Sequence, residues 1–554
     1  MSTDDGTRLV SDIYFPPCAG PHPVLLMRQP YGREIASTVV YAQPEYFARA
    51  GFLVVIQDVR GRGDSDGQFE AFQNEASDGR QTIRWAAALP DSDSRVCMYG
   101  FSYQAYTQLA VLDDPPEALV AIAPHMAAAE LYSGWFYRQG ILRLATTASW
   151  ANQMLREDAW RRGAEATAQD LEVAYTENRL VRQLPLNSID PITREDLPNY
   201  ARNWLTHSKY DSYWQSIDCS EALARSKVPA FHLGGLYDYY VRGSVDAYTC
   251  RENKKEDFFL LAPWKHIPWE SNMLGLDLGS ECRLDTDALL VDWFNSKLGR
   301  SPKTYEGVRY FLLGANQWAD AVTWPPPAEP INYYLHSGGH ANSRFGDGRL
   351  KLDRPEDQPT DHFVYDPEVP VLAPGGMIPA WGPIDLSAQQ QGNNLLVFDG
   401  DPVAGETTFV GEPELHLWVD SSVDATAFVA RISWLKPDGS ARFISMGAAG
   451  FDSAEPGAAF DRSNGAIRLR LDFDPVALTL SKGDALRLDL ASSAFPLLAL
   501  HPNTRTPAEE VPNPSHFRRA RQTIFHDPIR SSSLRMPRAV APAASKSDES
   551  SFLE

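Results

Sequence analysis

The stretch MYGFSYQAYTQLA, residues 98–110, places Ser102 where a serine could act as a nucleophile. An apolar run ends in Gly100 and a helix-forming stretch follows the serine, so the pattern predicts a strand-to-helix turn. Such a turn exposes the serine Oγ and leaves the amide of Tyr103 able to donate to an oxyanion. Gln104 stands where the general G-x-S-x-G motif has its second glycine. Helix capping by Ser102 is therefore an equally good interpretation of these residues alone.

An acid and a base follow in the chain order of an α/β hydrolase, serine then aspartate then histidine. Asp238 follows the predicted strand PAFHLGG, and His266 follows the predicted strand DFFLLAP. Both loops would open at the same carboxyl edge of a parallel sheet. A histidine base can take the serine proton, and an aspartate can orient the imidazole. We therefore expect Ser102, Asp238 and His266 to form a catalytic triad.

Other histidines compete for the role of base. His125 also follows a strand but precedes the acid, and it stays open as an alternative that mutagenesis can test. His232 lies inside a predicted strand, where a structural imidazole is the better interpretation. His207 falls in a helical region before the acid.

A second oxyanion donor is needed besides the Tyr103 amide. Tyr31, in MRQPYGR, follows the first strong predicted strand. A well-placed donor contributes roughly 3 kcal/mol to transition-state stabilisation. From the residues alone, packing is nevertheless the favoured role for Tyr31.

The elements that must position these residues alternate between strands and helices. Apolar strand-like runs and the helix-like stretch at 76–89 predict a mostly parallel sheet covered on both faces. The runs lie at 22–28, 51–58, 95–100, 118–124, 227–235 and 257–263. We therefore predict an α/β-hydrolase fold.

Changes in pattern predict four regions. The α/β-hydrolase domain takes residues 1–129 and 221–320, and a helical lid interrupts it at 130–220. Short alternating strands predict an all-β jelly-roll domain at 321–535. Residues 536–554 are typical of a disordered tail. The clearest strand signals in the third region lie at 414–422, 427–435, 466–473 and 485–493.

Composition narrows the class of partner. The 554 residues carry a formal net charge of -21, which argues against nucleic acid and anionic membranes as partners. No apolar run approaches the roughly 20 residues that span a bilayer. The 5 cysteines lack metal-binding spacing. We expect a cytoplasmic protein without a metal or cofactor, and a homodimer is compatible with the sequence.

Several longer motifs resemble one family of acyl hydrolases. They are RQPYGR, QDVRGRGDSDGQF, ASDGRQTIRWAAALPDSDSRVCMYGFSYQA, GGLYDYYVRGS, LAPWKH and YYLHSGG. The chain thereby resembles the cocaine esterase and X-Pro dipeptidyl-peptidase-like family, which includes α-amino acid ester hydrolases and glutaryl-7-aminocephalosporanic acid acylases. The likeness runs from residue 28 to about 340, and the β-rich remainder is similar to that family's C-terminal jelly roll, with weaker motifs.

The resemblance implies roles for individual residues. Ser102 matches the nucleophile, Asp238 the acid and His266 the base, while Tyr31 matches the tyrosine that forms the oxyanion hole with the Tyr103 amide. This overturns the packing role favoured for Tyr31 above. The family's elbow reads G-x-S-Y-x-G, so Gln104 is no anomaly and the true departure is Ala105 in place of that glycine.

The resemblance also bears on the substrate. In α-amino acid ester hydrolases, acidic residues that follow the catalytic aspartate hold the substrate ammonium, but here Tyr239, Tyr240 and Val241 follow it. Tyr240 resembles an acyl or aryl pocket residue of cocaine esterase, and Trp135 and Trp150 match aromatic pocket walls. Packing is an equally good interpretation of all three aromatic side chains. The polar loop DVRGRGDSDG, residues 58–67, is interpreted as a turn with salt bridges, not as an ion site.

These observations predict a serine hydrolase that acts on a small-molecule ester, or less readily an amide, through an acyl-enzyme. The alternatives are an X-Pro dipeptidyl peptidase or β-lactam acylase, and an acyltransferase or cyclase with the same triad. A noncatalytic binding module based on the β-rich region is the least favoured alternative.

Overall fold

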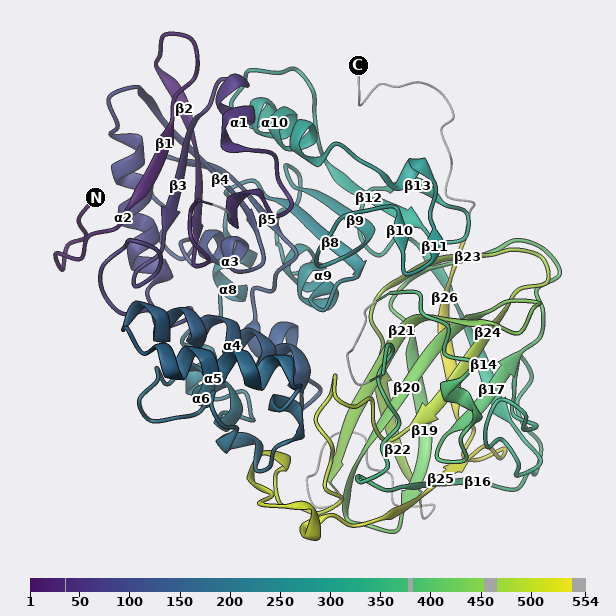
Figure 1. The fold of residues 1–554 in the computed structure, drawn as a ribbon. Coiled ribbons are helices and arrows are strands. Elements are labelled where there is room, and N and C mark those ends of the chain that lie inside the picture. Colours follow the sequence, from purple (N-terminus) through teal and green to yellow (C-terminus); the bar gives the residue numbers. More distant parts are fainter. Residues whose placement is uncertain (35, 377–381, 453–465, 541–554) are drawn as a thin grey trace.

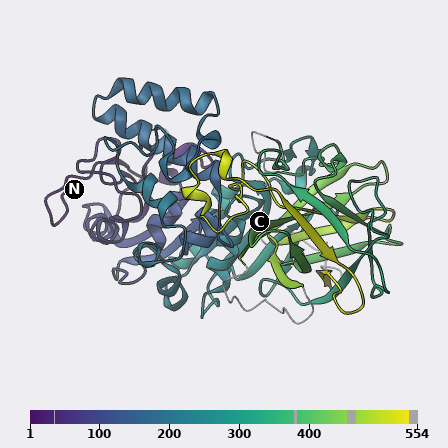
Figure 2. The same ribbon diagram turned by 90° about the horizontal axis from the view of Figure 1, so that it is seen from below.

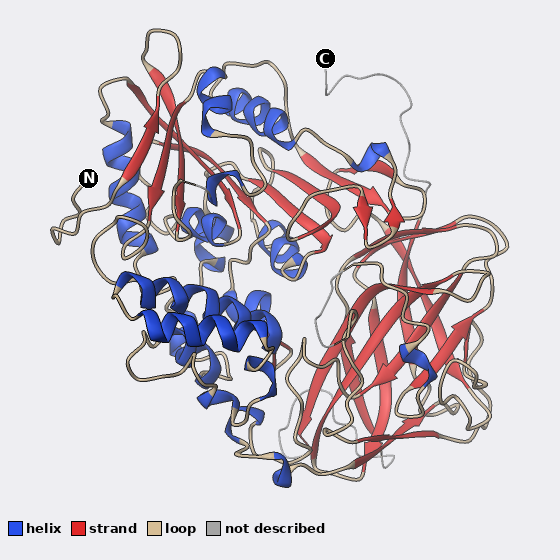
Figure 3. Cartoon of the chain, in the orientation of Figure 1, coloured by secondary structure: helices blue, strands red, loops and turns tan. Residues whose placement is uncertain are grey.

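The computed structural model describes residues 1–34, 36–376, 382–452 and 466–540. An α/β part is followed by a β-rich part, and most helices outside the α/β sheet gather beside it (Figures 1 and 3). Within the described ranges, no helix combines the length and the apolar character needed to cross a membrane.

A nine-stranded sheet forms the α/β part, in the order β1-β3-β2-β4-β5-β8-β9-β12-β13. The inner strands run parallel, whereas β1 and β13 pair antiparallel at the two edges. The strands are β1 (Ser11–Tyr14), β2 (His22–Gln29), β3 (Leu53–Asp58), β4 (Ser92–Phe101), β5 (Leu119–His125), β8 (Phe231–Tyr237), β9 (Phe258–Lys265), β12 (Gly307–Leu312) and β13 (Gln317–Ala321). The strands predicted from apolar runs in this part are confirmed.

Helices cover both faces of this sheet, which explains why β2 and β3 are buried along their whole length. On one face, α1 (Pro44–Arg49) and α10 (Thr286–Lys297) pack over the central strands. On the other face lie α2 (Glu75–Ala87) and α3 (Tyr103–Leu109). Helix α9 (Val241–Thr249) packs against β8.

A largely helical segment connects β5 to β8. Its helices are α4 (Leu144–Arg161), α5 (Glu165–Thr176), α6 (Tyr200–Thr206), α7 (Ser212–Gln215) and α8 (Ser220–Arg225), with the short turns η2 (Tyr132–Phe136), η3 (Leu180–Arg182) and η4 (Leu186–Ser188). The predicted helical region 130–220 also contains a small hairpin of β6 (Tyr137–Arg138) and β7 (Ile141–Leu142), which the sequence did not indicate. Two-residue strands leave no periodic pattern in a sequence.

The β-rich part is a thirteen-stranded arrangement. Its strands are β14 (Ala328–His336), β15 (Arg349–Lys351), β16 (Asp361–Tyr365), β17 (Leu396–Gly400), β18 (Thr407–Gly411), β19 (Glu414–Ser421), β20 (Ala425–Leu435), β21 (Ala441–Asp452), β22 (Ile467–Asp472), β23 (Val476–Leu480), β24 (Ala485–Ala491), β25 (Ala520–Phe525) and β26 (Ser533–Ala539). The four strands predicted most clearly are confirmed as β19, β20, β22 and β24.

The start of the predicted disordered tail is corrected by β26. Met536 and Ala539 belong to this strand, which pairs with β14 on one side and with β19 on the other. A strand whose partners lie about 120 and 200 residues earlier cannot be recognised from local pattern. The rest of the predicted tail, 541–554, lies outside the described residues.

The two parts share buried contacts. One hydrophobic cluster runs from the β8 and β9 region of the α/β sheet into the β-rich part. Arg138 of β6 forms a buried ion pair with Asp474 at 2.7 Å, and Tyr237 Oη donates to the Phe443 carbonyl at 3.2 Å. Figure 2 shows a late segment of the chain, in yellow, at the junction with the helical segment; there the Ala499 amide donates to the Leu142 carbonyl at 2.9 Å.

Candidate active site

Ser102 occupies a sharp turn between β4 and α3. Its backbone has φ 59° and ψ -129°, a conformation that non-glycine residues adopt only where the surroundings impose it. Its amide donates to the His125 carbonyl at 2.9 Å, and its carbonyl accepts from the amides of Ala105 and Tyr106. The serine is thereby fixed at the carboxyl end of the parallel sheet.

Gly100 makes room for the long side chain of Gln104. The glycine has φ 139°, and a Cβ there would lie 2.5 Å from Gln104 Cβ. The Gln104 side chain folds back, so that Oε1 accepts from the Phe101 amide at 3.2 Å. Ala105 is fully buried against the core. The elbow thus accommodates Gln104, which departs from the general motif, and Ala105, which departs from the family's motif.

Asp238 and His266 meet at the ends of neighbouring parallel strands. Asp238 directly follows β8 and His266 directly follows β9. His266 Nδ1 lies 2.9 Å from Asp238 Oδ1; the Asp238 side chain is fully buried and that of His266 is 17% exposed. The imidazole centroid is 5.4 Å from the ring of Phe101, the residue before Ser102. The structure therefore brings the three predicted triad residues to one edge of the sheet.

The competing histidines have different surroundings. His125, the last residue of β5, is fully buried, and its Nδ1 lies 2.9 Å from Tyr41 Oη. Burial lowers the pKa of His125 to about 3. Burial also lowers the pKa of His232 to about 3, and neither of its ring nitrogens has a hydrogen-bond partner among the described residues. Neither imidazole has the carboxylate contact that His266 makes within the described chain.

The Tyr31 hydroxyl faces Ser102. Burial raises the pKa of Tyr31 to about 12, and interactions with the side chains of Trp150 and Ser102 partly oppose this rise. The hydroxyl is therefore a neutral O–H donor across the physiological range. Tyr103 is the first residue of α3, a position whose amide has no intrahelical acceptor. Both predicted oxyanion donors thus border the serine.

The three predicted pocket aromatics are in contact with one another. The Tyr240 ring lies 5.1 Å from the His266 ring and stacks on Trp135 at 4.2 Å. The Trp135 and Trp150 rings are 5.8 Å apart, and Trp150 and Tyr31 pack against the same hydrophobic cluster. An aromatic wall therefore extends from the predicted base to the predicted oxyanion donor.

The sequence matches two protein-family models. X-Pro dipeptidyl-peptidase (S15 family) matches residues 5–268, and X-Pro dipeptidyl-peptidase C-terminal non-catalytic domain matches residues 301–535. The chain is also 28% identical over 466 residues to cocaine esterase of Rhodococcus sp. (strain MB1 Bresler), and the alignment covers 79% of each chain. The chain belongs to the cocaine esterase and X-Pro dipeptidyl-peptidase-like family. It is accordingly a serine hydrolase, of a family that acts on esters or peptides.

Solved structures show the same fold along nearly the whole chain. An aminopeptidase from a marine sediment Thaumarchaeota archaeon superposes with a TM-score of 0.79 at 22% identity, covering 97% of this chain and 95% of its own. An α-amino acid ester hydrolase gives a TM-score of 0.78 at 21% identity, with the same coverage. This member of the cocaine esterase and X-Pro dipeptidyl-peptidase-like family thus has an α/β domain followed by a β-rich domain.

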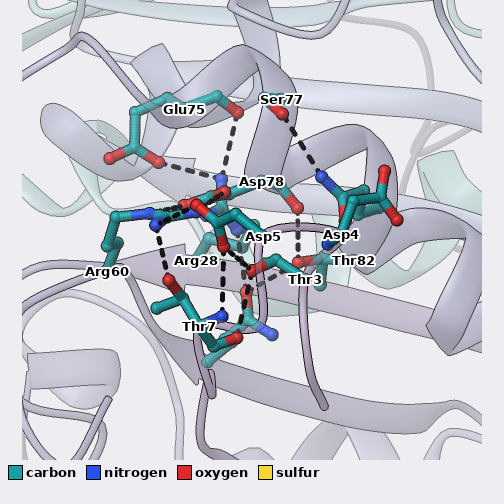
Figure 4. A network of polar contacts seen from close by, with 12 residues as sticks. Thr3, Asp4, Asp5, Thr7, Arg28, Arg60, Glu75, Ser77, Asp78 and Thr82 are labelled. Carbon is teal, nitrogen blue, oxygen red and sulfur yellow. Dashed lines mark hydrogen bonds and ion pairs between the residues drawn. The ribbon is translucent and has the colours of Figure 1, made fainter. Parts of the chain in front are cut away.

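A buried polar network lies beneath the elbow and was not predicted. Tyr103 Oη donates to Glu75 Oε1 at 2.9 Å, and Arg28 Nη1 donates to Glu75 Oε2 at 2.8 Å. Burial raises the pKa of Glu75, although its contacts with Arg28 and Tyr103 oppose the rise. Figure 4 shows the ion pair of Arg28 and Glu75 beside the ion pair of Arg60 and Asp78. The sequence signal that could have revealed this network is Arg28, a charged residue near the end of an apolar strand.

The polar loop 58–67 forms salt bridges, as interpreted from the sequence. Arg60 pairs with Asp78 at 2.7 Å, and Arg62 pairs with Asp158 at 3.2 Å. Across the described ranges, no group of three or more histidine, cysteine or acidic side chains has an arrangement that could hold a metal ion. Arg60 and Arg62 of this loop are therefore paired with acidic side chains of the neighbouring helices α2 and α4.

Proposed function

We propose that the protein cleaves a carboxylic ester, or less readily an amide, through an acyl-enzyme on Ser102. The contact of His266 Nδ1 with the buried Asp238 carboxylate, at the sheet edge that carries Ser102, is the observation that carries the proposal. Because Nδ1 is engaged by Asp238, Nε2 is left for the serine proton.

The reaction follows from these positions. Ser102 Oγ attacks the substrate carbonyl carbon as His266 takes its proton, and Asp238 stabilises the resulting imidazolium. The Tyr31 hydroxyl and the Tyr103 amide donate to the oxyanion of the tetrahedral intermediate. His266 then protonates the leaving alcohol or amine, and afterwards activates the water that releases the acid from Ser102.

We assign the acyl or aryl group of the substrate to the aromatic wall of Trp135, Trp150 and Tyr240. A free α-ammonium group is disfavoured because the residues after Asp238 are not acidic. In addition, the nearly buried Arg143 donates from Nη1 to the Tyr239 carbonyl at 2.8 Å, which brings positive charge to the acid loop. An uncharged, aromatic or apolar acyl group suits these surroundings best.

The helical segment would serve as a lid over the proposed active site, since Trp135 and Trp150 both belong to it. We further assign the β-rich domain to a jelly roll, following the resemblance to the family. If the lid excludes water, the same acyl-enzyme would transfer its acyl group to an alcohol or amine.

A substrate screen with matched variants tests the proposal. We expect p-nitrophenyl esters to be turned over faster than Ala-Pro and glutaryl anilides. Ser102→Ala and His266→Ala should each lower kcat by at least about 10⁴-fold, as triad members do. Retained turnover in His266→Ala together with its loss in His125→Ala would instead make His125 the base. Faster turnover of Ala-Pro anilide would favour the dipeptidyl-peptidase alternative.

A further inference from the structure

The loop 58–67 closes over the side chain of Asp58, the last residue of β3. This carboxylate is fully buried. A Cβ at Gly63 would lie 1.9 Å from Asp58 Oδ2, so only glycine lets the loop backbone approach this closely. Ser65 Oγ donates to the Asp58 carbonyl at 2.7 Å, which ties the far side of the loop to the same residue. The loop thus shields one carboxylate from water.

The shielded carboxylate contacts the residues on both sides of Tyr31. Gln29 Nε2 donates to Asp58 Oδ1 at 3.0 Å, and the Arg33 amide donates to the same oxygen at 2.8 Å. Arg33 Nη1 donates to Asp58 Oδ2 at 2.7 Å. Gln29 Oε1 in turn accepts from the Tyr31 amide at 2.9 Å. Asp58 therefore holds the positions two residues before and two residues after Tyr31.

The Tyr31 segment depends on these hydrogen bonds, because it follows β2 and pairs with no strand among the described residues. Gly32 has φ 94° and a Cβ there would meet nothing within 4 Å, so the space beside Gly32 is open and adds no contact that would hold the segment. An oxyanion donor contributes to catalysis only when it is held where negative charge develops. Hydrogen bonds to a desolvated carboxylate are strong enough to supply that order.

We propose that Asp58 is a positioning residue of the oxyanion hole, which acts by holding the Tyr31 hydroxyl against Ser102. The inference rests on the proposed function, in which Tyr31 donates to the oxyanion. The loop 58–67 would thereby contribute to catalysis without touching the substrate. Arg33 also pairs with Asp12 and Asp64, so Gln29 and the Tyr31 amide are the groups that depend most directly on Asp58.

A double-mutant cycle tests this dependence. Kinetics on a p-nitrophenyl ester would compare Asp58→Asn, Tyr31→Phe and the double variant of the full chain, with thermal unfolding as the check on folding. We expect Tyr31→Phe to lower kcat about 100-fold and Asp58→Asn to lower it about tenfold, with KM changed less than twofold. In the Tyr31→Phe background, Asp58→Asn should lower kcat less than twofold, because the hydroxyl that it positions is gone.

Two further variants keep the result interpretable. Asp66→Asn, in the same loop, removes only an exposed ion pair with Arg8 and should leave kcat unchanged. If Asp58→Asn does not fold, Gln29→Met takes its place; it leaves the contacts between Asp58 and Arg33 intact and should repeat the tenfold, nonadditive loss.

The outcomes separate this inference from the proposed function. An equal loss of kcat from Asp58→Asn or Gln29→Met in both backgrounds, or no loss in either, would overturn the positioning role of Asp58. An unchanged kcat in Tyr31→Phe would overturn the oxyanion role of Tyr31 itself, and with it the inference.

Discussion

Tyr31 is partly buried and polar, and the low exposure of its hydroxyl surroundings determines its charge state. Burial raises its pKa to about 12, so the neutral phenol persists well above the usual ionisation range near pH 10. A neutral phenol can donate to an oxyanion, whereas a phenolate would repel it. The side chain is thus suited to its proposed role over a wide range of pH.

The pH dependence of kcat should reflect this shift. Between pH 9 and 10.5 we expect no fall in kcat that depends on Tyr31, because its hydroxyl keeps its proton until about pH 12. Initial rates for the wild type and Tyr31→Phe, corrected for spontaneous ester hydrolysis, provide the measurement. An alkaline loss with a midpoint near pH 10 that disappears in Tyr31→Phe would show that the phenol ionises normally.

At the scale of elements, the turn between β4 and α3 depends on a glycine. Gly100→Ala would place a methyl group 2.5 Å from Gln104 Cβ at φ 139°. We expect a loss of about 1–3 kcal/mol in stability, together with a slower reaction at Ser102. Thermal unfolding and kcat measure both effects. Gly405→Ala, at an exposed glycine with no atom within 4 Å of a new Cβ, should change neither.

The turn between β4 and α3 also depends on the hydrogen bonds of the Tyr103 hydroxyl. It accepts from the Phe72 amide and donates to Glu75, each at 2.9 Å, so Tyr103→Phe would leave two buried groups unpaired. We expect a loss of about 1–3 kcal/mol in unfolding free energy. Tyr99→Phe is the matched control, because the buried Tyr99 hydroxyl has no hydrogen-bond partner among the described residues. Equal tolerance of both variants would contradict the proposed importance of this contact.

The sequence was sufficient to predict elements that carry a local signal. Continuous apolar runs identified the buried parallel strands, and the apolar run, glycine and helix former around Ser102 predicted a strand-to-helix turn, which left helix capping open as an alternative role of the serine. The hairpin of β6 and β7 and the strand β26 were missed, since the first is too short and the second depends on distant partners. The buried contacts of Asp58 and Glu75 were missed for a related reason: their partners come together only in the folded sheet.

At the scale of the whole molecule, a late segment connects the β-rich domain to the helical segment. The turn η8 (Ala508–Glu510) contacts η4, and Glu509 within it is buried. Burial raises the pKa of Glu509 to about 7, with a smaller contribution from Glu510. The nearby Tyr132 and Tyr137 carry no positive charge that would stabilise the ionised carboxylate of Glu509.

This carboxyl should make stability depend on pH. The folded state favours the protonated form, so it binds more protons than the unfolded chain between about pH 4.5 and 7, and stability falls as the pH rises through this range. Glu509→Gln removes the free-energy cost of ionising this buried carboxyl, which is at most about 3 kcal/mol. We therefore expect the variant to raise the unfolding temperature by several degrees at pH 8 and by much less at pH 5. The exposed Glu510→Gln should not reproduce this difference.

Covalent labelling of the nucleophile tests the central claim most directly. A fluorophosphonate reacts with a serine that a neighbouring base activates, and peptide mass spectrometry locates the adduct. We predict one adduct on the peptide that contains Ser102, no adduct in Ser102→Ala, and much slower labelling in His266→Ala. An adduct on another residue, or undiminished labelling of Ser102→Ala, would contradict the account.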